Sequence, residues 1–212
     1  MIYRTFGKRL LDLIITVPAL IVLAVPFALL SWLVRAKLGS PVLFRQQRPG
    51  LKGKGFTMLK FRTMIDANDA NGDPLPDAQR ATPFGNWLRR TSLDELPELI
   101  NVVKGEMSLV GPRPLLMRYL PRYTPEQMRR HDAPPGITGL AQINGRNEVP
   151  WDKKFEIDVE YVDRCSLLLD LQILIGTVRT VFLKEGVSMG KHFSSPEFLG
   201  TEAPDFAGEK SA

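Results

Sequence analysis

The chain has little cysteine and little histidine. Its 212 residues include one cysteine, Cys165, and two histidines, His131 and His192. A lone cysteine excludes an intramolecular disulfide and fits a reducing, cytosol-facing setting. Two histidines argue against a zinc site built on imidazoles, so a bound metal would be a hard cation on carboxylate oxygens. The length allows one domain, alone or with an anchor.

Acidic residues are fewer than basic ones. The 23 Asp and Glu face 28 Lys and Arg, which gives a net charge of +5 and a pI near 9.4. Such a surplus is compatible with nucleic acid, anionic lipid or phosphorylated substrates. Charge alone therefore does not choose the partner.

Charge is absent from Leu13 to Val34, a run of roughly 22 residues that would extend ~33 Å as one helix. Pro18 and Pro26 interrupt it, and each removes a helical hydrogen bond. Basic residues flank the run on both sides: Arg4, Lys8 and Arg9 before it, Arg35 and Lys37 after it.

A spanning helix satisfies the positive-inside rule at one end only, whereas a helix that bends and returns satisfies it at both. We therefore predict a re-entrant membrane anchor over residues 1–38, with a span as the alternative. A cleaved signal peptide is a third interpretation, but no small-x-small cleavage site follows the apolar run.

Residues 39–193 are predicted to form a small, irregular α/β domain that is mostly helical. Two strands, 42–48 and 56–62, flank a loop rich in glycine and lysine. Alternation in the second strand places Lys60 and Arg62 on one face. Residues 66–80 read as a surface loop, and 131–147 as a turn-rich loop of the kind that is usually functional.

Three further helices are expected. One runs from Leu93 to Val103 and stops at Gly105, and a second starts at Thr124 with a capping box to Gln127. The third carries apolar residues at helical spacing and is either a core helix or an amphipathic helix lying on a membrane. Its stripe is Leu168, Leu171, Ile175, Val178 and Phe182. Residues 194–212 read as a loose C-terminal tail.

The segment Ser92-Leu93-Asp94-Glu95-Leu96-Pro97 has two interpretations. Ser92 and Glu95 fit a capping box, and acidic residues are favoured in a first helical turn. Alternatively, Asp94 stays ionised and attacks phosphorus or holds Mg²⁺, while Glu95 serves as a base or orients a second substrate.

Arg113 lies between Pro112 and Pro114, so a stiff backbone would present its guanidinium fork to a phosphate. The alternative is a rigid turn with a surface arginine. Weaker candidates are Arg89, Arg90, Arg146 and Asp158.

Over nearly its whole length the chain resembles the small monotopic phosphoglycosyl transferases of bacteria. The matching motifs occur in one order: 3–12, Gln47-Arg48-Pro49-Gly50-Leu51, Leu59-Lys60-Phe61-Arg62-Thr63-Met64, 92–97, 101–108, Gly111-Pro112-Arg113-Pro114, 135–142 and Asn144-Gly145-Arg146-Asn147. A set of this size is far more specific than any one motif. It favours the catalytic interpretation of Asp94 and Glu95.

The resemblance implies transfer of a sugar-1-phosphate from a UDP-sugar to undecaprenyl phosphate, with release of UMP. It implies that Asp94 is the nucleophile of a covalent aspartyl-phosphosugar intermediate and a ligand of Mg²⁺, that Glu95 helps to activate the lipid phosphate, and that Arg113 holds phosphate. It also implies substrate binding by Lys60, Arg62, Arg89, Arg146 and Asp158.

The implied setting is the cytoplasmic face of a bacterial inner membrane, beside downstream glycosyltransferases and without nucleic acid. The implied fold is a re-entrant helix, a small α/β core and interfacial helices. Small family members bend the membrane helix at Ser-Pro, whereas this chain has Val25-Pro26 and an additional Pro18, so the bend is expected at either proline or at both.

The identity of the sugar stays open at this point. The downstream sequence resembles enzymes for N-acetylated donors such as UDP-diacetylbacillosamine, which we favour. The alternatives are a hexose-1-phosphate transferase using UDP-galactose or UDP-glucose, and a non-catalytic, membrane-anchored module that binds polyanions.

Overall fold

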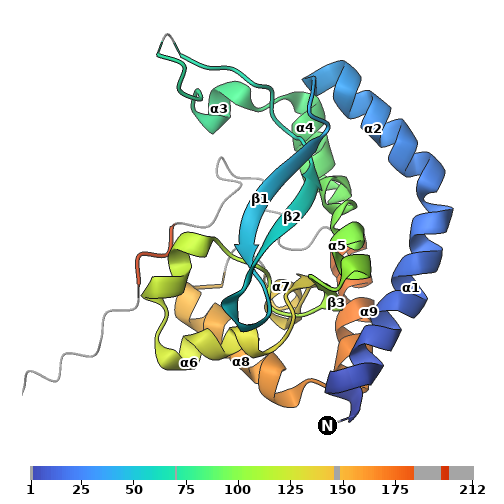
Figure 1. The fold of residues 1–212 in the computed structure, drawn as a ribbon, viewed down its shortest axis with the longest axis vertical. Helices are drawn as coiled ribbons and strands as arrows, with labels where there is room; N and C mark the ends of the chain where they lie inside the picture. Colours follow the sequence, from blue (N-terminus) through green and yellow to red (C-terminus); the bar gives the residue numbers. More distant parts are fainter. Residues whose placement is uncertain (1, 70, 146–148, 184–196, 201–212) are drawn as a thin grey trace, which may run out of the picture.

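The computed structural model of the protein describes residues 2–69, 71–145, 149–183 and 197–200. The described chain is mostly helical with two small sheets, as predicted for the α/β class (Figure 1). Its α-helices are α1 (Lys8–Val22), α2 (Ala24–Leu38), α3 (Asp77–Arg80), α4 (Pro83–Arg90), α5 (Glu98–Lys104), α6 (Pro125–Met128), α7 (Leu140–Ile143), α8 (Trp151–Arg164) and α9 (Leu167–Leu183). Its strands are β1 (Leu43–Pro49), β2 (Gly55–Phe61), β3 (Ser108–Val110) and β4 (Gly136–Thr138). A π-helical turn, η1 (Tyr3–Gly7), precedes α1, and short 3-10 turns are η2 (Leu51–Gly53), η3 (Leu93–Glu95), η4 (Met117–Arg122) and η5 (Arg129–Asp132).

Helices α1 and α2 form a bent pair along one side of the molecule (Figure 1). The segments Tyr3–Val22 and Ala24–Leu38 meet at 64°, with the break at Leu23. Pro26 cannot donate a hydrogen bond to Val22, and its ring crowds that carbonyl, so the break falls just before Pro26. Pro18 lies inside α1. Among the described residues no helix is by itself long and apolar enough to cross a bilayer, although this bent pair together meets the criteria of length and composition.

A stripe of buried polar residues joins α1 to the rest of the protein. Lys8, Asp12 and Thr16 are spaced four apart, so they share one helix face. The Lys8 Nζ atom lies 2.7 Å from the carboxylate of Asp170 on α9. Asp12 accepts hydrogen bonds from the Ser108 hydroxyl and the Leu109 backbone N–H, both in β3. The side of α1 that faces the core is therefore fixed by polar contacts.

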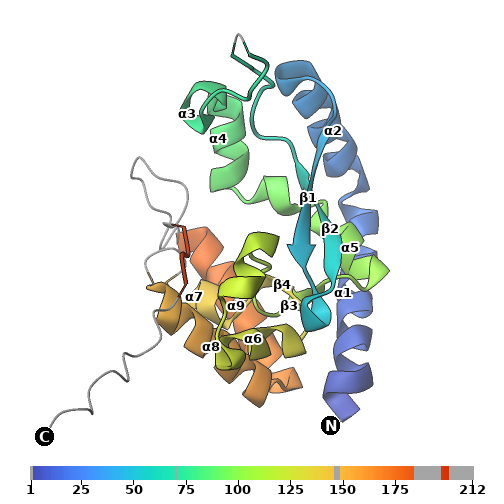
Figure 2. The ribbon, with the colours of Figure 1, turned by 60° about the vertical axis from the view of Figure 1, so that its left-hand side comes forward.

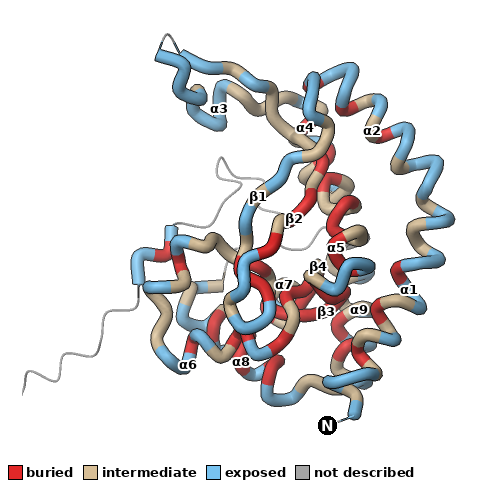
Figure 3. Tube along the Cα trace, in the orientation of Figure 1, coloured by how far each residue is buried: buried red, intermediate tan, exposed pale blue. Residues whose placement is uncertain are grey.

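The other sides of the bent pair are exposed, as the long pale-blue stretches of the tube in Figure 3 show, and they carry apolar side chains. Large apolar side chains that are more than half exposed follow both helices and the turn before them. They are Ile2, Phe6, Leu10, Ile14, Ile21, Val22, Val25, Leu29 and Trp32.

Strands β1 and β2 pair antiparallel from Leu43–Phe61 to Pro49–Gly55, which confirms the predicted hairpin. A second, parallel sheet of β3 and β4 was not predicted, because each strand has three residues and β4 lies among turn residues. The main core lies where β2, α5, both short strands, α8 and α9 meet (Figure 2).

The predictions about helix ends are confirmed in part. At Thr124 the predicted capping box with Gln127 is confirmed. At Ser92 the capping box is wrong: Ser92 has φ 55° and its side chain makes no cap hydrogen bond. The predicted helix from Leu93 to Val103 is divided into the 3-10 turn η3 and helix α5, with Pro97 between them. Helix α5 does stop at Gly105, whose φ of 83° suits glycine.

The apolar stripe predicted on the last helix is not a core face. Leu168, Ile175 and Val178 are more than half exposed, whereas Ile173, outside the stripe, is fully buried. The core interpretation is therefore wrong for the described side chains of that stripe, and the side chain of Phe182 lies outside them. Beyond it, Phe198 is 3% exposed and packs against the aromatic rings of α8 and η4, a contact that a loose tail would lack. Residues 194–196 and 201–212 of the predicted tail lie outside the described residues.

Candidate active site

A large cavity opens beside one face of the β1–β2 hairpin. Its volume is about 840 Å³. The hairpin, the 3-10 turn η3, the segment after Gly111 and helix α8 contribute its walls. Every predicted site residue within the described part of the chain lines this cavity: Lys60, Arg62, Arg89, Asp94, Glu95, Arg113 and Asp158. Arg90 lines it as well, whereas Arg146 lies outside the described residues.

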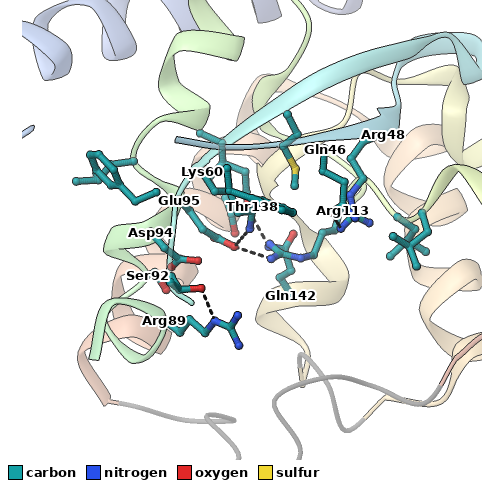
Figure 4. Close-up of a pocket in the computed structure, with 18 of the residues that line it drawn as sticks. Gln46, Arg48, Lys60, Arg89, Ser92, Asp94, Glu95, Arg113, Thr138 and Gln142 are labelled. Atoms are coloured by element: carbon teal, nitrogen blue, oxygen red, sulfur yellow. Dashed lines mark hydrogen bonds and ion pairs between the residues drawn. The ribbon is translucent and has the colours of Figure 1, made fainter. Parts of the chain in front are cut away.

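Asp94 and Glu95 sit on η3 and line this cavity (Figure 4). The turn that carries them starts at Ser92, whose left-handed backbone is uncommon for a residue with a side chain and costs about 1–3 kcal/mol. Left-handed backbone at Ser92 lets the chain leave α4 and re-enter a helical turn within two residues. Both carboxylates therefore reach the cavity from one tight turn.

Glu95 is held by two cations. Its Oε1 atom lies 2.6 Å from Lys60 Nζ and 2.5 Å from a terminal nitrogen of Arg113 (Figure 4). Burial alone would raise the pKa of Glu95, but Arg113 and Lys60 outweigh burial and hold that pKa well below its usual range. Glu95 is thus an anion that is already bound to the groups expected to bind phosphate.

Asp94 is in the opposite electrostatic condition. Its side chain is buried, and among the described residues no ion pair holds it. Burial, and next the charge of Glu95, raise the pKa of Asp94 to about 6. At neutral pH this carboxylate is still mostly ionised, and its charge is weakly compensated. An ionised, desolvated carboxylate facing a cavity is suited to nucleophilic attack.

Glu98 is a buried carboxylate beside Lys60, and the sequence analysis missed it. It is 1% exposed, and its Oε1 atom lies 3.1 Å from Lys60 Nζ. Burial and the neighbouring Glu95 raise the pKa of Glu98 to about 7. Its spacing of three residues from Glu95 is the signal that could have revealed it.

Arg130 holds the backbone of Arg113 in place, and it is another residue that the sequence analysis missed. One Arg130 nitrogen donates a 2.8 Å hydrogen bond to the Arg113 carbonyl and lies 2.7 Å from Asp158. Both members of the Arg130–Asp158 pair are buried. Asp158, predicted to bind substrate, therefore holds Arg130, and through it the backbone of Arg113. No motif around Arg130 indicated this role.

Two further predicted cations, Arg89 and Arg62, have local partners. The Nε of Arg89 donates to Thr63 Oγ1 at 2.9 Å, and Arg62 pairs with the exposed Asp66 at 2.9 Å. Alternation places Arg62 on the cavity face with Lys60, as predicted. These arginines still present positive charge to the cavity, which concentrates anions there.

Asp94 is also the predicted ligand of Mg²⁺. The described residues contain no group of three or more His, Cys, Asp or Glu side chains that would hold a metal. Mg²⁺ commonly uses one or two protein carboxylates and takes its other ligands from water and substrate phosphates. A single unpaired carboxylate in a cationic cavity fits that mode and does not fit an all-protein metal site.

The chain was compared with known proteins. Residues 3–184 match the family described as bacterial sugar transferase. An uncharacterised sugar transferase, EpsL, of Bacillus subtilis is 54% identical over 92% of this chain and 96% of its own length. The UDP-glucose:undecaprenyl-phosphate glucose-1-phosphate transferase of Xanthomonas campestris is 41% identical over 82% of this chain and 38% of that protein. The undecaprenyl-phosphate galactose phosphotransferase of Salmonella typhimurium is 38% identical over 85% of this chain and 41% of that protein.

These matches cover most of the chain, including the hairpin, the Asp94–Glu95 turn and the Arg113 segment. They agree with the motif resemblance found in the sequence and with a cavity that combines a free carboxylate with several cations. The chain belongs to the bacterial sugar transferase family, and the enzyme class predicted for it, a phosphoglycosyl transferase, is confirmed.

Proposed function

We propose that the enzyme transfers a sugar-1-phosphate from a UDP-sugar to undecaprenyl phosphate and releases UMP. The observation that carries this proposal is the pair of adjacent carboxylates in one cationic cavity, with Glu95 bound by cations and Asp94 left for attack. The family match supports the reaction class. The relatives named for glucose and galactose transfer support undecaprenyl phosphate as the acceptor.

The roles follow from the charges in the cavity. An oxygen of Asp94 attacks the phosphorus that carries the sugar, and UMP leaves with the electron pair of the broken bond. Arg113 and Lys60 stabilise the phosphate charge that develops. A substrate phosphate would compete with Glu95 for Arg113 and Lys60. Glu95, once displaced, would regain a higher pKa and could orient or activate the incoming lipid phosphate.

Mg²⁺ belongs to this proposal as the expected cofactor. When bound, it would neutralise phosphate charge and make the phosphorus easier to attack. Asp94 is the residue that would contact it. Such a role requires no further protein carboxylate beyond those that line the cavity.

For the membrane, we propose that the bent α1–α2 pair enters one leaflet of the bacterial inner membrane from the cytoplasmic face and returns. Support comes from the 64° break before Pro26 and from the exposed apolar faces of both helices. The exposed apolar stripe of α9 favours a helix that lies on the same surface. A lipid acceptor would then reach the cavity without leaving the bilayer.

The donor sugar has two candidates. The motif resemblance favours an N-acetylated donor such as UDP-diacetylbacillosamine. The relatives named for glucose and galactose favour the hexose alternative, although this chain covers only about two fifths of their length. A panel of donors is therefore required.

The test is UMP release by the detergent-solubilised protein with Mg²⁺, undecaprenyl phosphate and a panel of UDP-sugars. The panel contains the glucose, galactose, N-acetylated and diacetamido donors, and the Asp94→Asn variant is assayed in parallel. We expect release with at least one donor, dependent on the lipid and abolished in Asp94→Asn. Turnover retained in a folded Asp94→Asn protein would contradict the proposal, and lipid or polyanion binding without turnover would favour the binding module.

A further inference from the structure

Arg48 lies on the wall of the cavity at the far end of strand β1. The side chains of Phe44, Gln46 and Arg48 line the cavity, whereas Arg45, between them, does not. This alternation is the ordinary period of a strand. Arg48 is thus aimed at the site by the same hairpin that carries Lys60.

Arg48 lacks the kind of partner that other cavity cations have. Among the described residues no carboxylate pairs with it, in contrast to Lys60, Arg113 and Arg130. One terminal nitrogen donates to Gln46 Oε1 at 2.6 Å. Its Nε atom is buried and has no hydrogen-bond partner in the described chain. A buried guanidinium donor without an acceptor is costly unless an anion arrives.

A second cation lies next to Arg48. Figure 4 shows Arg48, Gln46 and Arg113 at one end of the site and Asp94 and Arg89 toward the other. Burial, and next the positive charge of Arg113, lower the pKa of Arg48 to about 10. Glu98 and the hydroxyls of Tyr119 and Tyr123 act in the opposite direction. Two guanidinium groups in one partly desolvated space repel each other, and a phosphate between them would stabilise both.

We propose that Arg48 and Arg113 together bind one phosphate group, and that two substrates use this position in turn. The phosphate of UMP leaves from it, and the phosphate of the polyprenyl acceptor then occupies it. This inference rests on the proposed function. Arg48 has no role among the residues predicted from the sequence.

In-line displacement explains why the UMP phosphate and the lipid phosphate would occupy the same position. In the first step an Asp94 oxygen bonds to phosphorus, and the bond from phosphorus to the UMP oxygen breaks on the opposite side. In the second step a phosphate oxygen of the lipid bonds to the same phosphorus, and the bond to Asp94 breaks. Both the leaving and the attacking phosphate therefore lie opposite Asp94. Arg48 and Arg113 are cations at that end of the cavity.

The test is the affinity of the detergent-solubilised chain for UMP, measured by calorimetry for the wild type, Arg48→Gln and Arg45→Gln. Arg45 is the matched control, since it lies on the same strand, is exposed and does not line the cavity. We expect Arg48→Gln to weaken UMP binding by about tenfold or more, the size of effect expected when a charged donor to an anion is removed. Arg45→Gln should bind UMP as the wild type does.

Competition between undecaprenyl phosphate and UMP tests whether the two phosphates share one position. Undecaprenyl phosphate should displace UMP from the wild type, and Arg48→Gln should weaken the lipid's apparent affinity by a similar factor. Equal UMP affinity in the two variants, or lipid and UMP bound simultaneously, would overturn the inference. Arg48→Lys, with the charge kept, should fall between wild type and Arg48→Gln, which guards against a fold defect in the neutral variant. A wild type that binds UMP but turns over no donor would contradict the proposed reaction and not the phosphate position.

Discussion

Two neighbouring carboxylates of this enzyme acquire opposite properties from their surroundings. Glu95 is bound by Lys60 and Arg113 and remains ionised well below neutral pH, whereas burial raises the pKa of Asp94 to about 6. Adjacent residues on a tight turn point in different directions, so each meets a different set of charges. This division of environments supports the proposal that Asp94 attacks the phosphorus and that Glu95 compensates charge.

The raised pKa of Asp94 predicts the acidic side of the pH profile. Attack needs the ionised carboxylate, so kcat/KM should fall about tenfold per pH unit below pH 6 and level off above it. Glu98 titrates close by, at about 7, so the profile of Glu98→Gln is the control. If kcat/KM of Glu98→Gln still falls below about pH 6, the fall reports the protonation of Asp94. Constant activity down to pH 5 would argue against an ionised Asp94 as nucleophile.

A substitution at Arg113 can separate the effect of the guanidinium's shape from the effect of its positive charge. Arg113→Lys keeps the charge but loses the bidentate fork, so kcat should fall on the order of 100-fold, as when one preorganised donor is removed. The matched control is Arg118→Lys, because Arg118 is exposed and does not line the cavity. Near-normal turnover in Arg113→Lys would remove Arg113 from the phosphate site.

The sequence identified the residues whose neighbours in the chain signal chemistry. Asp94 and Glu95 are adjacent, Arg113 lies between prolines, and Lys60 alternates with Arg62. Arg130 and Arg48 were missed as site residues because their roles depend on contacts with residues distant in sequence or on the lack of an acidic partner. Asp158 was found, but its pairing with Arg130, 28 positions away, and the hydrogen bond from Arg130 to the Arg113 backbone were not readable from the sequence.

Among the elements, the hairpin was predictable and the parallel sheet was not. Alternating residues and a glycine-rich loop specify β1 and β2 locally. Strands β3 and β4 are three residues each, and they pair across the segment that carries Arg113. The backbone of Gly111 lies so close to Pro134 and Gly136 that a Cβ atom there would meet a carbonyl oxygen at 2.2 Å. That close approach is set by tertiary packing, which local patterns do not encode.

Helix α8 carries a prediction about stability. Asp158→Asn leaves the buried charge of Arg130 without its partner, which should lower the free energy of unfolding by about 3–5 kcal/mol. The measurement is denaturant unfolding in detergent. The control on the same helix is Glu156→Gln, whose exposed pair with Lys153 should change stability by less than about 1 kcal/mol. Equal effects of the two substitutions would contradict the structural role of Asp158.

The bent α1–α2 pair carries a prediction about membrane topology. In a Cys165→Ser background, single cysteines at Ile2 and Ser40 lie before and after the pair, and both positions are exposed. A re-entrant pair places both on the cytoplasmic side, so an impermeant maleimide should label both in sealed inside-out vesicles. Labelling of only one position would show that the pair spans the bilayer.

The whole molecule joins a bent pair of helices with exposed apolar faces to a cationic cavity through buried polar contacts. Lys8 and Asp12 fix α1 to α9 and β3, so the exposed apolar faces and the cavity keep a constant relation to each other. Such an arrangement suits an enzyme with one water-soluble and one lipid substrate. Family membership and the long apolar N-terminal run were readable from the sequence, whereas this fixed relation required the tertiary contacts.

The covalent intermediate on Asp94 is tested most directly by the intact mass of the protein. The chain is incubated with Mg²⁺ and the UDP-sugar that supports turnover, without any lipid acceptor, and its mass is compared with that of Asp94→Asn. We predict that the wild type gains the mass of one sugar-phosphate, releases one UMP per chain and loses the added mass when undecaprenyl phosphate is supplied. UMP release that requires the lipid, with no added mass, or an adduct that persists in Asp94→Asn, would contradict nucleophilic attack by Asp94.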